Sequence, residues 1–237
     1  MIRRLGWWLI VAAVVIAILV GIGNLPTTTR TSINYTVSSQ RIPLYQKALS
    51  FIDRDVEMRA LAARVLPDTR DREAALMRLL DWTHQNVRPT PAGFPVVDDH
   101  PYNIVVRGYG PADQAADVFA IIASYRGIPA TLDFCHDAAG QTVYAMAVAQ
   151  VDGAWRLIDP REGRAFKNTA GKLASIDELK ADPSLVAGLP VPAESHGHDY
   201  AALVGELDPI GSNLRPAEQM PLSRLWSEIR RPFGGTA

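Results

Sequence analysis

The stretch GYGPADQAADVFAIIASYRGIPA, residues 108–130, decides the fold, because it marks both ends of a buried helix. Pro111 suits the first turn of a helix, where a missing backbone N–H costs little. Asp113 places negative charge near the positive end of the helix dipole, and Gly127 supplies the left-handed residue that commonly follows a helix. Apolar side chains repeat at helical spacing between these ends, at Ala115, Val118, Phe119 and Ile122. We therefore predict a helix that starts near Ala112 and is buried along one face.

Two further helices are predicted before this one. Residues 42–65 and 71–87 carry apolar side chains at helical spacing. Pro67 ends the first of these helices, since proline cannot continue a helix interior. Pro89 and Pro91 then open a long loop that extends to the stretch quoted above.

Strand patterns follow the central helix. The side chains of ATLDF, residues 130–134, show the alternating pattern of a strand. The segment TVYAMAVAQV, residues 142–151, is rich in strand-forming residues. Asp152 and Gly153 form a hairpin turn signal before the partner strand AWRLID, residues 154–159. Helices followed by antiparallel strands predict the α+β class.

The C-terminal part of the chain shows weaker patterns. Ser175 and Glu178 match a capping box, which predicts a short helix. The tail from Pro190 is rich in proline and glycine, and short helices are expected near 197–206 and 221–231.

Composition narrows the class of protein. The chain has 237 residues, of which 48% are hydrophobic and 21% charged, enough for one globular domain with a substantial core. No basic patch with interleaved aromatic residues is present, which argues against nucleic acid as a partner. A single cysteine excludes an intrachain disulfide and a cysteine-rich metal cluster. We expect no cofactor and no metal.

The N-terminus carries a membrane signal. Arg3 and Arg4 precede an uncharged run from Leu5 to Asn24, close to the ~20 residues that cross a bilayer as a helix. Trp7 and Trp8 lie at one end of this run, where indole rings favour the headgroup layer. Basic residues before the span place the N-terminus in the cytoplasm and the rest of the chain outside, periplasmic or extracellular.

A cleaved signal peptide is the alternative, because Gly21 and Gly23 form a small-x-small pair. The length of the apolar run and the lack of an A-x-A site favour an uncleaved anchor that contacts the membrane through residues 5–24. We therefore expect a transmembrane anchor at 1–24, a Thr- and Ser-rich linker at 25–40, a folded domain at 41–190 and a C-terminal extension at 191–237.

Three segments resemble the transglutaminase-like superfamily, a papain-related fold. They are DWTHQNVR at 81–88, the stretch at 108–130, and VDGAWRLIDP at 151–160. The resemblance covers roughly residues 70–180 and implies helices packed on an antiparallel sheet. It also implies a cysteine at the N-terminus of the buried helix, a histidine on the next long strand and an aspartate on the strand after it.

The chemistry of such a site has a clear physical basis. A helix N-terminus stabilises a thiolate and so lowers the pKa of the thiol. The histidine accepts the thiol proton, and the aspartate holds the imidazole in the useful tautomer.

This chain departs from that pattern at two of the three positions. The cysteine position is Ala112, which has no nucleophilic atom. The histidine position is about Tyr144, with Thr142 or Val143 as alternatives, and a tyrosine of ordinary pKa near 10 is a poor base at neutral pH. The aspartate is present as Asp159, which cannot perform acyl transfer alone.

These departures predict a pseudoenzyme, anchored in the membrane and facing the cell envelope, that acts as a binding or scaffolding module. Its partner would be a peptide, a protein or a glycan, in cell-envelope or polysaccharide machinery by family analogy. Candidate binding residues are Asp113 and Gln114 beside the lost nucleophile, Trp82, and His100 in the loop beside the implied cleft.

Two alternatives assign chemistry to other residues. Cys135, in FCHD, is a candidate nucleophile for an active hydrolase or acyltransferase, although on a strand it would point away from His136. His196 and His198 would share one side of an extended segment and suggest a metal-dependent enzyme, but a usual site needs three or four ligands.

Overall fold

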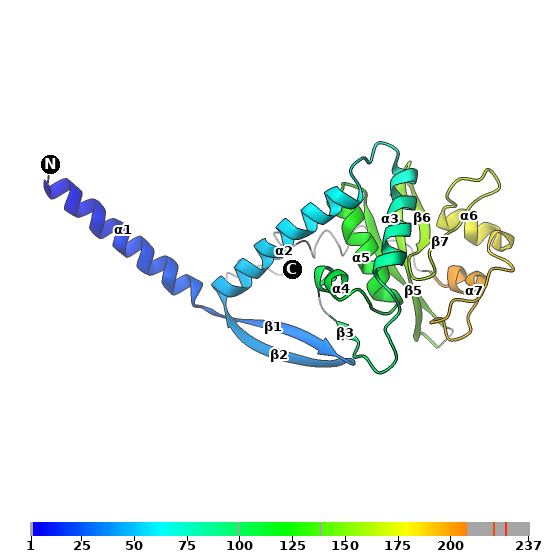
Figure 1. Ribbon diagram of the computed structural model, residues 1–237, viewed down its shortest axis with the longest axis horizontal. Coiled ribbons are helices and arrows are strands. Elements are labelled where there is room, and N and C mark those ends of the chain that lie inside the picture. Colours follow the sequence, from blue (N-terminus) through cyan, green and yellow to red (C-terminus); the bar gives the residue numbers. More distant parts are fainter. Residues whose placement is uncertain (1, 99, 138, 208–219, 221–225, 227–237) are drawn as a thin grey trace.

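The computed structural model describes residues 2–98, 100–137, 139–207, 220 and 226. Its elements are helices and antiparallel sheets, so the predicted α+β class is confirmed. Helix α1 extends away from the other elements, followed by a β-hairpin and then by the packed body of helices and sheet (Figure 1).

Helix α1, Ile2–Gly23, is long and apolar enough to cross a membrane. Its segment Gly6–Gly23 has a mean hydropathy of 2.5 and is not buried against the rest of the chain. A signal sequence near an N-terminus has the same length and composition, so the helix by itself indicates a candidate span.

Residues 25–40, expected to be a Thr- and Ser-rich linker, form most of a hairpin, which the sequence analysis did not predict. Strands β1, Pro26–Ile33, and β2, Thr36–Pro43, pair along their full length. Asn34 and Tyr35 take φ values of 47° and 64°, and a two-residue turn with positive φ at both positions matches the twist of a hairpin. The threonines, interpreted as linker residues, are also good strand formers once such a turn sets their register.

The predicted helices are present close to their expected bounds. They are α2, Leu44–Val65, α3, Arg72–Asn86, and α5, Ala112–Tyr125. The loop expected between α3 and α5 contains two elements that the sequence did not reveal, β3, Val97–Asp98, and α4, Pro101–Arg107.

Local hydrogen bonding explains the unexpected helix α4. Pro101 occupies the first turn, the side chain of His100 accepts from the backbone N–H of Tyr102 at 3.1 Å, and Gly108 ends the helix at φ 76°. The prolines that suggested a loop lie before the helix or in its first turn, where proline is tolerated.

The main sheet has the order β4-β5-β6-β7 with antiparallel neighbours throughout. Its strands are β4, Ala130–His136, β5, Thr142–Val151, β6, Ala154–Asp159, and β7, Arg164–Ala165. Asp152 and Gly153, with φ of 51° and 79°, turn the chain between β5 and β6 as predicted.

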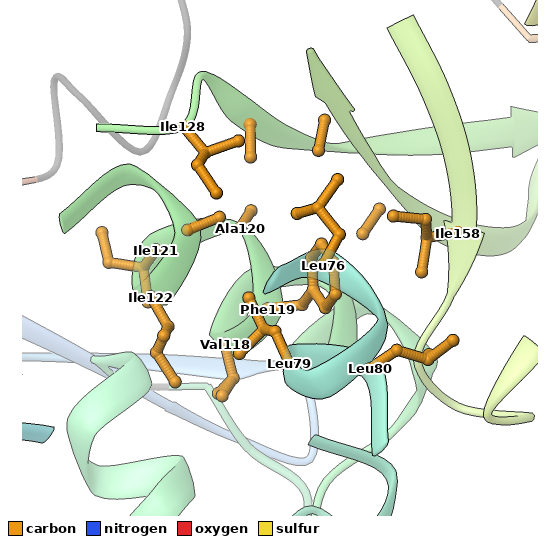
Figure 2. Packing of buried hydrophobic residues seen from close by; sticks show 14 of the residues in the cluster. Leu76, Leu79, Leu80, Val118, Phe119, Ala120, Ile121, Ile122, Ile128 and Ile158 are labelled. Atoms are coloured by element: carbon orange, nitrogen blue, oxygen red, sulfur yellow. The ribbon is translucent and has the colours of Figure 1, made fainter. Parts of the chain in front are cut away.

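Alternate residues of β5 enter two different hydrophobic clusters. Ala147 and Ala149 face the first cluster, which contains the buried side of α5 and residues of α3. Figure 2 shows Phe119 of α5 beside Leu76 and Leu79 of α3, with Ile158 of the sheet on the same side as Leu76. Helix α5 therefore lies in the middle of the main core.

The second cluster covers the opposite side of β5. It contains Tyr144, Met146 and Val148 together with residues of α6, Ile176–Ala181, and α7, Tyr200–Gly205. Between these helices lies the short 3-10 helix η1, Pro183–Leu185.

The two expectations for short C-terminal helices that can be compared with the structure are met. The capping box of Ser175 and Glu178 is formed in both directions, and α7 occupies the middle of the range 197–206. The helix expected at 221–231 lies, apart from residue 226, outside the described residues.

Truncation of the core tests this packing. We expect Phe119→Ala to lower the free energy of unfolding by about 3–5 kcal/mol, because the fully buried ring leaves a cavity among α3, α5 and the sheet. Thermal or denaturant unfolding of the full-length protein in detergent measures the change. The control Val106→Ala, at a side chain that is 70% exposed, should change stability by less than about 0.5 kcal/mol. Equal effects of the two substitutions would contradict the assigned core.

Candidate functional site

Ala112 is the first residue of α5, as predicted, and is buried in the second hydrophobic cluster. Its backbone N–H donates a hydrogen bond of 2.8 Å to Oε2 of Glu194. A carboxylate is stabilised at a helix N-terminus by the unsatisfied N–H groups and the helix dipole. The place where a thiolate would be stabilised is thus taken by the carboxylate of Glu194.

Glu194 is held there by Arg161, a guanidinium that is only 4% exposed. Nε of Arg161 lies 3.2 Å from Oε1 of Glu194, within ion-pair distance but without hydrogen-bond alignment. The other guanidinium nitrogens donate to the carbonyls of Val87, at 3.0 Å, and Gly110. Because a buried charge requires such partners, the segment after Pro190 is fixed over the start of α5.

Asp159 lies at the end of β6, fully buried, and accepts hydrogen bonds from two tyrosines. The hydroxyl of Tyr144 donates at 3.0 Å and 3.2 Å to the two carboxylate oxygens, and the hydroxyl of Tyr200 donates at 2.8 Å. The backbone N–H of Glu162 adds a bond of 3.0 Å. The carboxylate that would orient a histidine is therefore bound by phenol groups.

The pKa shifts in this network follow from burial. Burial raises the pKa of Asp159, and the hydrogen bonds from Glu162, Tyr200 and Tyr144 oppose that rise. Burial and the charge of Asp159 raise the pKa of Tyr144 and of Tyr200 above the ordinary value. Both phenols therefore hold their protons at neutral pH, and Tyr144 acts as a donor and not as a base.

The structure brings the predicted positions onto adjacent elements. Tyr144 on β5 and Asp159 on β6 belong to neighbouring antiparallel strands, and Ala112 shares the second cluster with Tyr144. Val143, an alternative for the histidine position, lies in the same cluster and is no base. That these positions are remnants of a catalytic triad stays a prediction.

Cys135 lies opposite Tyr144 on β4 and is fully buried. Burial, with the charges of Asp133 and Asp159, raises the pKa of its thiol to about 12. The reactive form of a cysteine is the thiolate, which is scarce at neutral pH when the pKa is this high. The strand register shifts between Cys135 and His136, and nothing in the described contacts joins the two side chains.

Three of the four predicted binding residues line one cavity. His100, Asp113 and Gln114 face a cavity of about 760 Å³ that is bounded by the hairpin, α2, α4, α5 and β4. The fourth residue, Trp82, is instead packed against the first hydrophobic cluster and does not line this cavity. Two neighbouring residues in the first turn of α5 thus have different surroundings. Ala112 is bonded to Glu194, and Asp113 lines the cavity.

Gln114 has a structural role in the wall of this cavity. Its amide Nε2 donates to the carbonyl of Val97 at 2.7 Å, and its Oε1 accepts from Arg107 at 2.9 Å. These bonds tie β3 and α4 to the start of α5. A buried amide with both of its groups satisfied in this way orders the cavity wall.

Asp113 contributes charge to the cavity. Burial raises the pKa of its carboxyl, and the nearby charges of Asp98 and Glu194 raise it further, against the bond from the N–H of Gln114. The carboxyl is therefore easier to protonate than an exposed aspartate and favours a positively charged neighbour.

The histidines proposed for a metal site lie in the turn that follows Glu194. His196 has a φ of 54°, and the N–H of His198 donates to the carbonyl of Ser195 at 3.1 Å. Among the described residues, no group of three or more histidine, cysteine, aspartate or glutamate side chains is arranged to hold a metal ion.

Comparison with known proteins gives structural neighbours only. No family model and no curated protein matches the chain. A proposed cysteine protease from Cytophaga hutchinsonii matches 50% of this chain at 14% identity with a TM-score of 0.39. A proposed protease from Parabacteroides distasonis matches 58% of this chain at 12% identity with a TM-score of 0.38. A transglutaminase matches 56% of this chain at 14% identity with a TM-score of 0.31.

The chain spans 40%, 36% and 44% of the length of these three structures. Because each match covers only part of both proteins, the α+β class is assigned from the helices and antiparallel sheets of this chain.

Three residues of the site escaped the sequence analysis: Arg161, Glu194 and Tyr200. Arg161 directly follows the segment VDGAWRLIDP, but nothing in the sequence links it to Glu194. Tyr200 begins the helix that Asp199 caps, and its contact with Asp159 joins residues 41 positions apart.

The raised pKa of Asp159 predicts a specific pH dependence. Its folded-state pKa lies above the usual 3.8, so the stability it contributes is complete below that value and is lost as pH rises through the folded pKa. We expect the wild-type protein to lose stability relative to Asp159→Asn as pH rises above the ordinary pKa of an aspartate, because the asparagine does not titrate. Unfolding of both proteins in detergent measures the difference, and parallel pH profiles would contradict the assignment.

Proposed function

We propose that this protein is a membrane-anchored, transglutaminase-like pseudoenzyme that faces the cell envelope and binds a peptide, protein or glycan. One observation carries the proposal: the backbone N–H of Ala112 is bonded to the carboxylate of Glu194 at 2.8 Å. An enzyme of the implied kind needs a thiolate and a substrate carbonyl at this point of the helix. Here an internal carboxylate replaces both.

The environment of Asp159 supports the loss of thiol chemistry. A triad needs a base that can accept a proton near neutral pH. The hydroxyl of Tyr144 donates a hydrogen bond to Asp159, and the pKa of this tyrosine is raised by burial and by the carboxylate charge. This pair stabilises the core and has no group ready to accept a proton from a nucleophile.

The cavity supports a binding role. Ligand sites in proteins are typically clefts or cavities of about 300–1,000 Å³, and the volume of this cavity, about 760 Å³, falls in that range. Polar and charged side chains line much of it, including Asp113 and Asp98. A ligand bound there would contact α5 beside Ala112 but would not need its reactivity.

The alternative of a relocated nucleophile gains little from the geometry. A buried thiol with a pKa of about 12 is inert at neutral pH, whatever its neighbours in sequence. A metal-dependent enzyme would need ligands in addition to His196 and His198.

The first test is activity. We expect the purified protein to catalyse neither hydrolysis nor transamidation of peptide amides, and Cys135→Ser to change nothing in either assay. Amide turnover by the unmodified protein that disappears in Cys135→Ser would show that the chemistry moved to β4 and would overturn the proposal.

A matched pair of variants tests the role of Glu194 in the Cys135→Ser background. A thiol created by Ala112→Cys should react slowly with iodoacetamide, because the carboxylate of Glu194 disfavours a thiolate beside it. Adding Glu194→Gln removes that charge and should raise the rate about tenfold or more. The Glu194→Gln protein without a thiol controls for background labelling, and equal rates for the two thiol variants would contradict the geometry.

The third test is topology. Because Arg3 and Arg4 precede the apolar segment Gly6–Gly23 of α1, we expect an uncleaved span with residues 30–237 outside the cytoplasm. Intact-mass measurement of the membrane-extracted protein reports the N-terminus, and a protease added outside the cell membrane reports the side. A mature N-terminus near Gly23 would contradict the anchor, and protection from the external protease would contradict the orientation.

A further inference from the structure

Strand β1 has an edge that is only partly covered. On one side β2 pairs with it from Pro26 to Ile33, while on the other side β3 pairs with it only at Ser32 and Ile33. Beyond this point the chain turns into α4, and no strand in the described ranges pairs with β1 on that side over residues 28–31. A strand edge of this kind is a template for another extended chain.

The backbone groups of Arg30 point to this open side. In an antiparallel strand, alternate residues direct their N–H and C=O groups to opposite neighbours. The N–H of Asn34 donates to the carbonyl of Val96 at 2.8 Å, on the β3 side. The carbonyl of Thr28 accepts from Nζ of Lys47 at 2.9 Å, away from β2. Arg30 is separated from each of these two residues by an even number of positions. Its N–H and C=O groups therefore point to the same side, away from β2.

The open edge coincides with the cavity. Residues 28–31 of β1 line it, and so do Asp98, His100 and Pro101, where β3 ends and α4 begins. A strand that continued the line of β3 past Asp98 would therefore run into the cavity. It would lie against β1 on one side and have α5 nearby.

The lining of the cavity carries both signs of charge, since Arg30, Lys47 and Arg54 line it as well as three aspartates. Around Asp113 the local charge is negative, because the charges that act on its carboxyl are those of Asp98 and Glu194. Asp98 and Asp113 both line it, and they lie close enough for the charge of Asp98 to act on Asp113. Within the described part of the chain, neither of them forms an ion pair. Asp113 lies in the first turn of α5, where its Oδ1 accepts a hydrogen bond of 2.9 Å from the backbone N–H of Gln114.

We propose that the cavity binds a short extended peptide segment of another protein, which adds to the edge of β1 in line with β3 and places a lysine or arginine beside Asp98 and Asp113. This inference rests on the proposed binding function. Of the three kinds of partner proposed there, a peptide, a protein or a glycan, it specifies a peptide segment. Strand addition draws affinity from main-chain hydrogen bonds and specificity from the side chains that enter pockets. The spaced backbone groups of a strand edge match a polypeptide and not a sugar ring.

The chain offers a matched pair of variants for the test, because Arg30 and Ser39 are direct partners in the hairpin. Proline at position 30 removes an N–H on the cavity edge, and proline at position 39 removes an N–H on the outer edge of β2. Both substitutions leave the bonds between β1 and β2 in place, since proline is tolerated at a strand edge. Arg30→Ala controls for the loss of the side chain.

The experiment uses the full-length protein in nanodiscs and a displayed library of random short peptides. We expect the library to yield binders enriched in lysine or arginine. Synthetic copies should bind Arg30→Pro about tenfold more weakly than Arg30→Ala, the effect of one lost hydrogen bond. The comparison is made with Arg30→Ala because the Arg30 side chain itself lines the cavity, while Ser39→Pro should bind like wild type. A second selection on Asp98→Asn with Asp113→Asn should lose the enrichment for basic residues.

Several outcomes would overturn the inference: no binder, binders equally sensitive to both proline variants, or binders without basic residues. A dimer of the protein that Arg30→Pro dissociates, with no peptide selected, would assign the edge to a second copy and would also overturn it. The proposed function fails separately, through amide turnover by the unmodified protein. A protein without turnover and without peptide binding would lose this inference alone.

Discussion

A buried guanidinium joins the parts of this protein that surround the start of its central helix. Arg161 contacts the carbonyls of Val87 and Gly110 and the carboxylate of Glu194. Its own carbonyl accepts a hydrogen bond from Nδ1 of His84 at 3.0 Å. One side chain thus connects the end of α3, the turn before α5, the end of the sheet and the C-terminal extension. A charge buried to this degree is stable only with such partners, which makes the arrangement of the four segments interdependent.

This arrangement decides the chemistry at the N-terminus of α5. The dipole of the helix and the N–H of Ala112 would favour any anion, and Glu194 supplies one from within the chain. Nearby, Asp159 is bound by the hydroxyls of Tyr144 and Tyr200, which keep their protons. Features that would activate a nucleophile in an enzyme here stabilise a closed polar core.

The opposite side of the same helical turn faces the cavity. Asp113 follows Ala112 directly, yet it lines the space between the hairpin, α2 and α4. The hairpin is therefore more than a connection between the candidate membrane helix and the folded body. It supplies a strand edge at the cavity, and Figure 1 shows the hairpin between α1 and the packed body.

The sequence by itself determined the elements whose signals are local. The periodicity of α2, α3 and α5, the Asp152–Gly153 turn and the capping box at Ser175 each depend on residues a few positions apart, and each is present. The same signals placed Ala112, Tyr144 and Asp159 on a helix start and two adjacent strands. Where local signals were ambiguous the prediction failed, as for the threonine-rich hairpin and for α4 behind its prolines.

Only the tertiary structure decided what those positions contact. The bond from Ala112 to Glu194 spans 82 residues, and that from Tyr200 to Asp159 spans 41. The cavity collects residues from the hairpin, three helices and β4. No periodicity or motif encodes such contacts, because they arise when separately formed elements pack and their buried polar groups must find partners.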